Sequence, residues 1–262
     1  METELKLSPA TREQAERVFS DPEVAPYLSA SRVINMETTY YDTAEGALRE
    51  IRWTLRLRRE GNRTLCTLKG PVEGLSRPEL EQEAESIGEG ATLLLQGLSL
   101  PEKVRIALKQ PLQATCGARF SRTEALYDNE RLRFCLSYDL GELQNDAQHA
   151  PLCELELELV SGTEEELRGF GEHLAAKHAL PVCETGKHQR ALELAKPTVR
   201  ELNPFFVASE LLNYCIRCGY VLFWMDEDKQ VHYSLTELGA RELPVRFGVD
   251  FTKGCAAPEE RP

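Results

Sequence analysis

The sequence predicts an α+β protein built on a closed antiparallel β-barrel, with charged side chains inside the barrel and helices covering its outside. Two observations lead to this fold class. Several segments alternate apolar and charged residues with the period of a β-strand, and their charged faces are sorted by sign. Faces of opposite charge can meet across an enclosed cavity when a sheet closes on itself. The alternative is an ordinary antiparallel sheet whose charged faces are solvated.

The composition of the 262 residues predicts a globular protein, since 42% of them are hydrophobic and can form a buried core. The longest strongly apolar run, Tyr220–Met225, is too short to span a bilayer. The acidic, alternating N-terminus lacks the pattern of a signal peptide. Eight scattered cysteines indicate reduced core thiols rather than a disulfide framework. We therefore expect a cytoplasmic protein without a membrane segment.

The formal net charge of −12 should repel nucleic acid and anionic membranes, so neither is expected as a partner. An acidic ligand would need a local basic site. Residues 52–70 supply one, with six lysines and arginines against a single glutamate. Residues 152–166, in contrast, carry six glutamates and no base. The chain thus separates a basic segment from an acidic one.

Six predicted strands carry the charged or polar faces, because residues two apart in a strand point to the same side. In chain order these faces are Glu2, Glu4 and Lys6; Arg52, Thr54, Arg56 and Arg58; Thr67 and Lys69; Arg77, Glu79, Glu81 and Glu83; Ser137 and Asp139; and Glu154, Glu156 and Glu158. Asp139 has a second interpretation, since it precedes Gly141 and could open a turn.

Helices to cover the barrel are predicted between and after these strands. Ser8 and Pro9 favour a helix over residues 9–20. Residues 89–110 form two short helical patterns broken by Pro101. Thr163 and Glu166 have the spacing of a capping box, which predicts a helix to about residue 179. A last helix is expected over residues 187–196.

These segments carry motifs in an order that resembles the CYTH superfamily, the triphosphate tunnel metalloenzymes, and within it the bacterial inorganic triphosphatases. The resemblance covers residues 1 to about 197. The motifs are Glu2-Thr3-Glu4-Leu5-Lys6, which fits the ExExK signature, Tyr40-Tyr41-Asp42-Thr43, Leu55-Arg56-Leu57-Arg58, Thr67-Leu68-Lys69, Arg77-Pro78-Glu79, Phe120-Ser121-Arg122, Asp139, Cys153 to Glu158, and the pair Lys187 and Arg190.

The resemblance implies an eight-stranded tunnel that hydrolyses inorganic triphosphate, a small-molecule polyphosphate, to pyrophosphate and phosphate with Mg²⁺ or Mn²⁺. It implies phosphate ligands at Lys6, Arg56, Arg58, Lys69, Arg122, Lys187 and Arg190. It implies metal ligands at Glu2, Glu4, Asp139, Glu154 and Glu156, with Glu158 and Glu79 or Glu81 as further candidates. Glu4, Lys6 and Lys69 are the residues expected to act in catalysis.

These residue types suit that chemistry. Triphosphate loses its hydration when it enters a tunnel, so fixed cations must replace the lost water. Arginine grips two phosphate oxygens with its planar fork, whereas lysine supplies a compact charge. Magnesium and manganese prefer carboxylate oxygens. A tunnel carboxylate is expected to act as the general base for the attacking water.

Three other functions are compatible with the same residues. A class IV adenylyl cyclase or a thiamine or nucleoside triphosphatase would use the same tunnel but needs room for an organic group. A non-catalytic polyphosphate or nucleotide-binding module would bind without turnover. A plain β-barrel interaction module would need no phosphate affinity at Arg56. Comparison of tripolyphosphate, ATP and thiamine triphosphate as substrates separates these possibilities.

The sequence divides into a tunnel domain, residues 1–197, and a C-terminal extension, residues 198–262. The extension is too short, and has too few histidines, for the helical CHAD domain that often follows in this family. A β-hairpin is expected, with strands at 220–224 and 231–235. Cys215 and Cys218 have zinc-knuckle spacing, with His232 and Cys255 as conceivable partners. Because a second CxxC is missing, reduced structural thiols are the favoured interpretation.

Overall fold

The computed structural model describes residues 1–97, 99–146, 148–194, 212–226 and 229–247. The chain divides into two compact units, Met1–Lys196 and Pro197–Pro262. No described helix is both long enough and apolar enough to cross a membrane.

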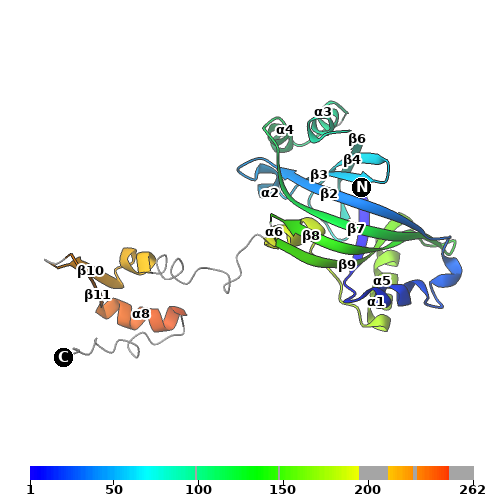
Figure 1. Ribbon diagram of the computed structural model, residues 1–262. Helices are drawn as coiled ribbons and strands as arrows, with labels where there is room; N and C mark the ends of the chain where they lie inside the picture. The colour runs from blue at the N-terminus through cyan, green and yellow to red at the C-terminus, as the bar shows by residue number, and fades with distance from the viewer. Residues whose placement is uncertain (98, 147, 195–211, 227–228, 248–262) are drawn as a thin grey trace. The chain divides into compact units, whose positions relative to one another are not determined.

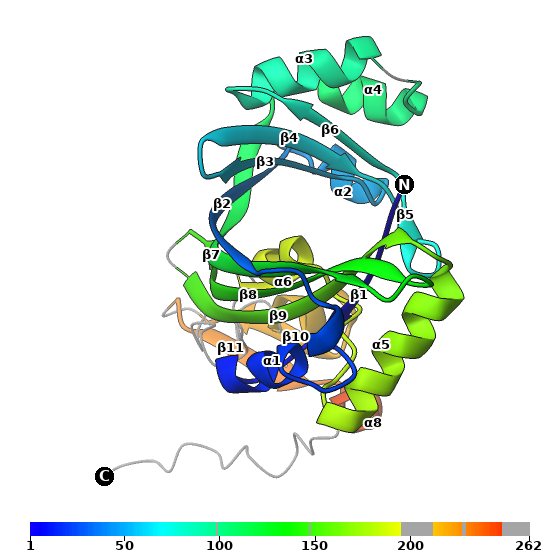
Figure 2. The ribbon, with the colours of Figure 1, turned by 90° about the vertical axis from the view of Figure 1, so that its right-hand side faces the viewer.

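The first unit is an antiparallel β-barrel with helices on its outside (Figures 1 and 2). Nine strands form one sheet in the order β5-β1-β9-β8-β7-β2-β3-β4-β6. They are β1 (Glu2–Leu7), β2 (Arg32–Asp42), β3 (Thr54–Glu60), β4 (Arg63–Lys69), β5 (Ser76–Arg77), β6 (Glu79–Glu83), β7 (Gln113–Asp128), β8 (Arg133–Asn145) and β9 (Gln148–Ser161). The closed-barrel prediction is confirmed.

The two ends of the sheet are joined by one stretch of chain that pairs on both sides. Arg77 of β5 pairs with Glu2 of β1, and Glu79 of β6 pairs with Lys69 of β4. Only Pro78 separates β5 from β6, because proline cannot donate a ladder hydrogen bond and interrupts the strand. Counted as one interrupted strand, β5 and β6 bring the barrel to the eight strands that the resemblance implied.

Helices cover the outer, apolar faces of the strands. They are α1 (Arg12–Phe19), α2 (Ala47–Glu50), α3 (Ile87–Gly97), α4 (Glu102–Leu108) and α5 (Glu164–His178), with a short 3₁₀ helix, η1 (Ala25–Tyr27); the remaining helix of this unit, α6 (Lys187–Leu194), packs on inner faces instead. Leu5 and Leu7 of β1 lie in a core with residues of α1 and α5, and Leu55 and Leu68 lie in a second core with residues of α3 and α4. The alternate residues of β1 therefore point to the sides that were predicted, with the charged face turned toward the inside of the barrel.

The inner faces change character along the barrel. On β7, Cys116 and Ala118 precede Arg122, and on β9 Leu152 precedes the glutamates. Cys116, Ala118 and Leu152 form an apolar cluster with Ala191 of α6, which contacts β7, β8 and β9 (Figure 2). Because α6 packs on this apolar stretch, it closes off the inner wall there and leaves the charged stretch lining a cavity.

Several boundaries differ from the sequence predictions. The first helix begins at Arg12, because the Thr11 hydroxyl, not Ser8, accepts the hydrogen bond from the Gln14 amide at 3.4 Å. Residues 51–52 belong to a turn in which Arg52 has a φ of 62°, so β3 starts at Thr54. The capping box of Thr163 and Glu166 is confirmed.

The turn considered at Asp139 is wrong, because β8 runs straight through it to Asn145. Gly141 instead allows β8 and β7 to lie close together. A Cβ atom at this position would lie 2.0 Å from the carbonyl oxygen of Arg119 on β7. The glycine therefore continues the strand rather than ending it.

The second unit contains a helical segment at residues 212–217, β10 (Val221–Met225), β11 (Val231–Leu235) and α8 (Glu237–Phe247). β10 and β11 pair as an antiparallel hairpin in the region where the sequence predicted one, from Val221 opposite Leu235 to Met225 opposite Val231. A small core of Cys215, Tyr220 and Leu243 holds the hairpin base to the helices.

Candidate active site

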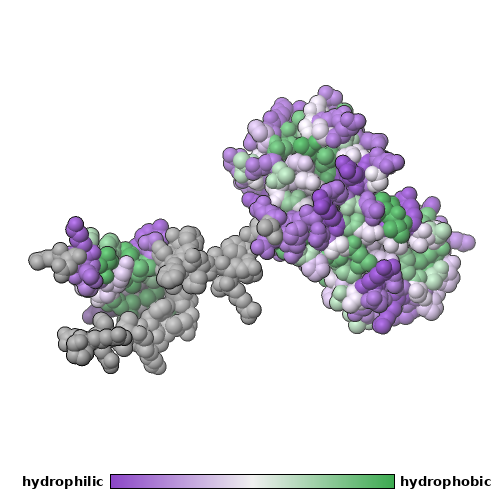
Figure 3. Space-filling model, viewed as in Figure 1, coloured by the Kyte–Doolittle hydropathy of each residue, from purple (hydrophilic) through white to green (hydrophobic). Residues whose placement is uncertain are grey.

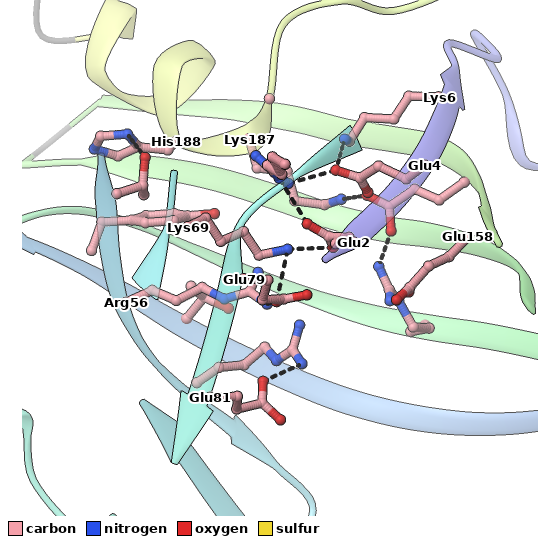
Figure 4. Close-up of a pocket in the computed structure, with 18 of the residues that line it drawn as sticks. Glu2, Glu4, Lys6, Arg56, Lys69, Glu79, Glu81, Glu158, Lys187 and His188 are labelled. Atoms are coloured by element: carbon pink, nitrogen blue, oxygen red, sulfur yellow. Dashed lines mark hydrogen bonds and ion pairs between the residues drawn. The ribbon is translucent and has the colours of Figure 1, made fainter. Parts of the chain in front are cut away.

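A cavity of about 370 Å³ lies within the first unit, lined by the inner faces of the strands and by the start of α6 (Figure 4). Its charged lining residues comprise seven cations and six carboxylates. The cations are Lys6, Arg56, Arg58, Lys69, Arg77, Arg122 and Lys187, and the carboxylates are Glu2, Glu4, Glu79, Glu81, Glu156 and Glu158. Thr38, Tyr40, Thr54, Phe120, Gly186 and His188 complete the lining.

Glu2 sits between two cations where the barrel closes. Lys69 Nζ lies 2.5 Å from its Oε1, and Arg77 Nε lies 2.7 Å from its Oε2. Burial alone would raise the pKa of Glu2, but the charges of Lys69 and Arg77 outweigh burial and lower it to about 2. Glu2 is therefore ionised over the whole physiological range.

Glu4 and Lys6, the next inward residues of β1, contact each other. Arg77 also reaches Glu4, with Nη2 at 2.5 Å from Oε1. Because β1 and β5 are paired at Glu2 and Arg77, a single arginine can hold both glutamates of the first motif. The whole ExExK motif therefore faces the cavity.

Arg56 and Arg58 of β3 are neighbouring cations of the lining whose ion pairs to the glutamates of β6 are long. Arg56 lies 3.9 Å from Glu79 and Arg58 lies 3.9 Å from Glu81, and Arg58 also contacts Glu60. The Nε atoms of both arginines are buried without a hydrogen-bond partner. Burial and the neighbouring Arg56 lower the pKa of Arg58 to about 10. Two adjacent cations on one face of a strand are suited to an anion.

Arg122 and Lys187 belong to a buried network at the side of the cavity nearest α6. Arg122 makes two bonds of 2.7 Å to Asp139 and one of 2.5 Å to Glu156. Lys187 Nζ lies 2.8 Å from Asp139 and 2.7 Å from Glu156, and it also contacts Glu154. Burial would lower the pKa of Lys187, but these three carboxylates raise it well above its usual value.

Two groups of carboxylates have oxygens close enough to share a metal ion, each within 4.8 Å of one another. The first, called here the β1 carboxylate group, is Glu2, Glu79 and Glu158. The second, the α6 carboxylate group, is Asp139, Glu154 and Glu156. The predicted metal ligands are thus split between the two groups, and Glu4 belongs to neither. Glu79 and Glu158, secondary candidates in the sequence, join Glu2.

The β1 carboxylate group fits a divalent cation better. Glu158 makes no hydrogen bond or ion pair within the described part of the chain, and burial together with nearby Glu2 raises its pKa to about 7. A carboxyl that resists ionisation marks a place where more positive charge would be favourable. Burial also raises the pKa of Glu154 in the α6 carboxylate group to about 7, but Glu154 is in contact with Lys187 and Arg190, and Arg122 contacts the other two members. Carboxylate oxygens are the donors that magnesium and manganese prefer.

Not every predicted ligand lines the cavity. Asp139 and Glu154 lie behind Lys187 and Arg122, and Arg190 contacts Glu154 rather than projecting into the cavity. Phosphate ligation by Lys187 or Arg190 would require each to exchange a carboxylate for a phosphate oxygen. The other predicted phosphate ligands, Lys6, Arg56, Arg58, Lys69 and Arg122, all line the cavity.

Arg77 and His188 also line the cavity, and neither was predicted as a ligand from the sequence. Arg77 could have been found, because it shares the inward face of Glu79 and Glu81. His188 follows Lys187 on α6, and its ring lies 4.8 Å from that of Tyr40. Burial lowers the pKa of His188 to about 4, so the imidazole is neutral. Because His188 lies on a helix, the two-residue alternation of the strands could not have identified it.

The possible zinc site does not assemble among the described residues. Cys215 is buried in the core of the second unit, Cys218 is exposed, and His232 bonds to Asp226 at 2.6 Å. No group of three metal-ligating side chains in the described ranges includes any of them. Cys255 lies outside the described residues.

The fold and the cavity define a β-tunnel protein whose interior is lined by cations and carboxylates. A model of the CYTH domain family matches residues 1–192, and the chain belongs to this family. An inorganic triphosphatase of Haemophilus influenzae is 27% identical over 177 residues, which are 64% of this chain and 49% of that protein. The chain thus spans about half the length of this curated relative.

Among solved structures, the chain is similar to HpAC1 of Hippeastrum, an adenylyl cyclase candidate whose dominant activity is that of a triphosphatase. The TM-score is 0.52 at 18% identity, and the match covers 78% of this chain and 98% of that one. At this level of identity the likeness supports the tunnel fold. The family therefore includes triphosphatases and cyclase-like proteins, and the reaction of this chain has to be argued from its own site.

Proposed function

We propose that this protein hydrolyses inorganic triphosphate to pyrophosphate and phosphate with the help of Mg²⁺ or Mn²⁺. The observation that carries the proposal is the enclosed cavity of about 370 Å³, whose wall combines seven cations with a carboxylate group in which the Glu158 side chain has no ion pair among the described residues. Its volume is near the lower end of the range for small-molecule sites, roughly 300–1,000 Å³. That size favours a triphosphate without an organic group.

In this proposal Arg56 and Arg58 form the central phosphate grip. Their neighbouring positions on one face of β3 are about 6.6 Å apart, so they can reach successive phosphoryl groups. Lys6, Lys69 and Arg122 add charge from three other strands. Lys187 and Arg190 would join by exchanging their carboxylate contacts for phosphate oxygens. The seven residues together replace the hydration that triphosphate loses.

Glu2, Glu79 and Glu158 would hold the principal metal ion, with Glu4 beside them and the α6 carboxylate group as a second position. The ion would offset the charge of the phosphate oxygens as the terminal bond breaks. Lys6 and Lys69 would stabilise the same developing charge from the protein side. Both are already held in the cavity by Glu4 and Glu2, so little reorganisation is needed.

Glu4 is the carboxylate proposed to orient the attacking water. The water oxygen forms a bond to the terminal phosphorus, the bridging P–O bond breaks, and pyrophosphate leaves with the bonding electron pair. One proton of the water passes to a tunnel carboxylate, for which Glu4 is the first candidate because it faces the cavity next to Lys6.

The decisive measurement is phosphate release from tripolyphosphate, ATP and thiamine triphosphate, each with Mg²⁺, with Mn²⁺ and with EDTA. We expect tripolyphosphate to be the best substrate by kcat/KM and its hydrolysis to stop in EDTA. Equal rates with and without EDTA contradict the metal mechanism. A preference for ATP with release of a cyclic product indicates a cyclase, and tight binding without turnover indicates a non-catalytic module.

We also propose that the protein works in the cytoplasm on a free, small-molecule polyphosphate. The net charge of −12 opposes binding to nucleic acid over most of the surface. The seven cysteines of the described residues are all free thiols, which suits a reducing compartment. Localisation of a tagged full-length chain tests this assignment.

A further inference from the structure

Glu164, the first residue of α5, lies on the outside of the barrel but reaches the strand that closes it. Hydrophilic residues are spread over the face of the first unit that Figure 3 shows, and most such residues need no role beyond contact with water. Glu164 has a local role, since it begins a helix and its Oε1 lies 2.7 Å from Nη2 of Arg168 one turn further on. Its two carboxylate oxygens also accept long-range hydrogen bonds, from the Leu75 amide at 3.0 Å and the Ser76 hydroxyl at 2.9 Å. These two bonds tie the start of α5 to β5.

The segment that closes the barrel, residues 74–77, is called here the seam segment. Its strand, β5, pairs with the first two residues of β1. Beside this pairing, the Glu4 amide donates a hydrogen bond to the carbonyl oxygen of Leu75 at 3.0 Å. This pairing is much shorter than that of an ordinary strand in a sheet. Contacts from outside the sheet can therefore contribute much of what fixes the position of β5.

The seam segment is shaped to receive the Glu164 carboxylate. Gly74 has a φ of 65°, in the left-handed region that glycine adopts without steric cost. A Cβ atom at Gly74 would lie 2.5 Å from Oε1 of Glu164, so any larger residue would displace the carboxylate. Two backbone hydrogen bonds between Glu73 and Ser76, of 2.8 and 3.0 Å, hold the turn in this form. The turn and the glutamate therefore fit each other independently of the ion pair to Arg168.

The seam segment ends at Arg77, which carries the effect of its position into the cavity. Arg77 Nε lies 2.7 Å from Oε2 of Glu2, and its Nη2 lies 2.5 Å from Oε1 of Glu4. All three side chains are largely buried, so a shift of β5 must also move the carboxylates that Arg77 holds. Misplacement of reacting groups by about 1 Å can cost on the order of 100-fold in rate. The contacts thus run without a gap from Glu164, through β5, to both glutamates of the first motif.

We propose that Glu164 is a positioning residue of this site, because it fixes the seam segment from outside the barrel and thereby sets where Arg77 holds Glu2 and Glu4. For its effect on the reaction, this inference rests on the proposed function. Glu164 does not line the cavity, so it acts only through other residues. A carboxylate suits the task, since one oxygen accepts from a backbone amide and the other from a hydroxyl. The phosphate grip on β3 is not among these contacts, so substrate affinity should change little.

Glu164→Ala and Glu166→Ala in the full-length chain test the proposal. Glu166 is the matched control, because its side chain is 34% exposed against 33% for Glu164, and it lies in the same helical turn. It bonds to Thr163 and Arg131 instead of the seam segment. In metal-free protein, hydrogen exchange of the Glu4 amide, followed by NMR, should be on the order of 10-fold faster in Glu164→Ala than in Glu166→Ala. This measurement needs no catalysis.

Steady-state kinetics with tripolyphosphate and Mg²⁺ are the second measurement. Glu164→Ala should lower kcat by roughly 10-fold and change KM by less than about 3-fold, since the carboxylates for metal and water move while the phosphate grip stays. Glu164→Gln should restore most of kcat, because its amide oxygen still accepts from Leu75 and its amide nitrogen can donate to Ser76. In an Arg77→Met background, Glu164→Ala should cost little more, as expected for residues that act in series.

Equal exchange rates of the Glu4 amide in Glu164→Ala and Glu166→Ala overturn the proposal. A loss of kcat that is fully additive with the loss in Arg77→Met also overturns it. If the wild-type chain does not hydrolyse tripolyphosphate, the proposed function fails, and the exchange measurement still decides whether Glu164 holds the seam segment.

Discussion

The β1 carboxylate group and the α6 carboxylate group are built from the same kinds of residue, yet their carboxylates are paired differently. Asp139, Glu154 and Glu156 each contact at least one of three cations, Arg122, Lys187 and Arg190. In the β1 group, Lys69 and Arg77 contact Glu2, and Lys69 and the more distant Arg56 face Glu79. Buried charges are tolerated when they are paired. All three members of the α6 group are therefore paired within the protein, whereas the side chain of Glu158 has no ion pair among the described residues.

The glutamate-rich strand β9 supplies both groups. Glu154 and Glu158 are four residues apart and lie about 13 Å apart along the strand, at the usual rise of a β-strand. Glu154 and Glu156 therefore meet the residues delivered by α6, while Glu158 reaches β1 and β6. One repeated motif can therefore serve two purposes, because a different element lies opposite each glutamate of β9. We infer that the α6 group holds a helix and the β1 group binds the metal.

The largest effect is expected from Lys187→Met, which removes the cation at the centre of the α6 carboxylate group. Three buried carboxylates would lose their shared partner, so the free energy of unfolding should fall by about 3–5 kcal/mol. Urea unfolding followed by far-UV circular dichroism measures the change. Lys109→Met, on an exposed lysine, is the control and should have no effect. A loss below about 1 kcal/mol, typical of a surface pair, would show that the network is not structural.

The next effect is expected at Arg58, a cation of the cavity lining next to Arg56 on β3. Arg58→Met should lower kcat/KM for tripolyphosphate by roughly 30-fold, equivalent to about 2 kcal/mol for a lost bond to a charged group. Its neighbour Arg59 is exposed and points to the other side of β3, so Arg59→Met is the matched control. Similar kinetic losses in the two variants would argue against Arg58 as a phosphate ligand.

The third effect is a pH dependence that separates the two groups. Glu158 has a raised pKa of about 7, so below pH 7 it keeps a proton that a metal ion must displace. Apparent Mn²⁺ affinity, measured by calorimetry, should rise by up to about 10-fold per pH unit up to pH 7 and then level off. Glu158→Gln should weaken binding and flatten this profile. Glu154→Gln removes the other carboxyl whose pKa is raised to about 7, but Glu154 already has Lys187 and Arg190 as partners, so this variant should leave the profile in place.

The raised pKa of Glu158 also makes the stability of the protein depend on pH. The sign of this effect is opposite to the sign of the effect of Glu2. Because Glu158 binds its proton more tightly folded than unfolded, it contributes less stability as pH rises from 4.5 toward 7 in the metal-free protein. Glu2, whose pKa is lowered to about 2, contributes stability above pH 4.5 that is lost as pH falls toward 2. Thermal unfolding of Glu158→Gln in EDTA should therefore show a smaller loss of stability across the upper window.

Much of the barrel could be predicted because a strand period is a local property. The inward placement of Glu2, Glu4 and Lys6 follows from parity alone, and so does that of Arg56 and Arg58. Two of the longest strands, β2 and β7, were anticipated only through short motifs, since their inner faces carry Thr38, Tyr40, Ala118 and Phe120 rather than repeated charges. A charged-face criterion cannot detect an inner face that packs under a helix.

The grouping of the site residues could not be predicted, because it depends on strand order and register. Nothing local indicates that Glu158 lies across from Glu4 on β1, or that Arg77 closes the barrel beside Glu2. The sequence also placed Asp139 and Glu2 in one set of ligands, whereas β8 and β1 are separated by β9 in the sheet. Long-range pairing, not residue type, decides which carboxylates share an ion.

The smallest effect is expected at Arg190, where the two possible roles give different results. The resemblance implies a phosphate ligand, but here its guanidinium contacts Glu154 and lies outside the cavity lining. If its main role is to hold α6, Arg190→Ala should change KM for tripolyphosphate by less than about 3-fold and cost about 1 kcal/mol of stability, the upper range for a partly exposed ion pair. Arg190→Lys, which keeps the charge, should restore most of that stability. A rise in KM near that of Arg58→Met, with unchanged stability, would instead make Arg190 a substrate ligand that leaves Glu154 when triphosphate binds.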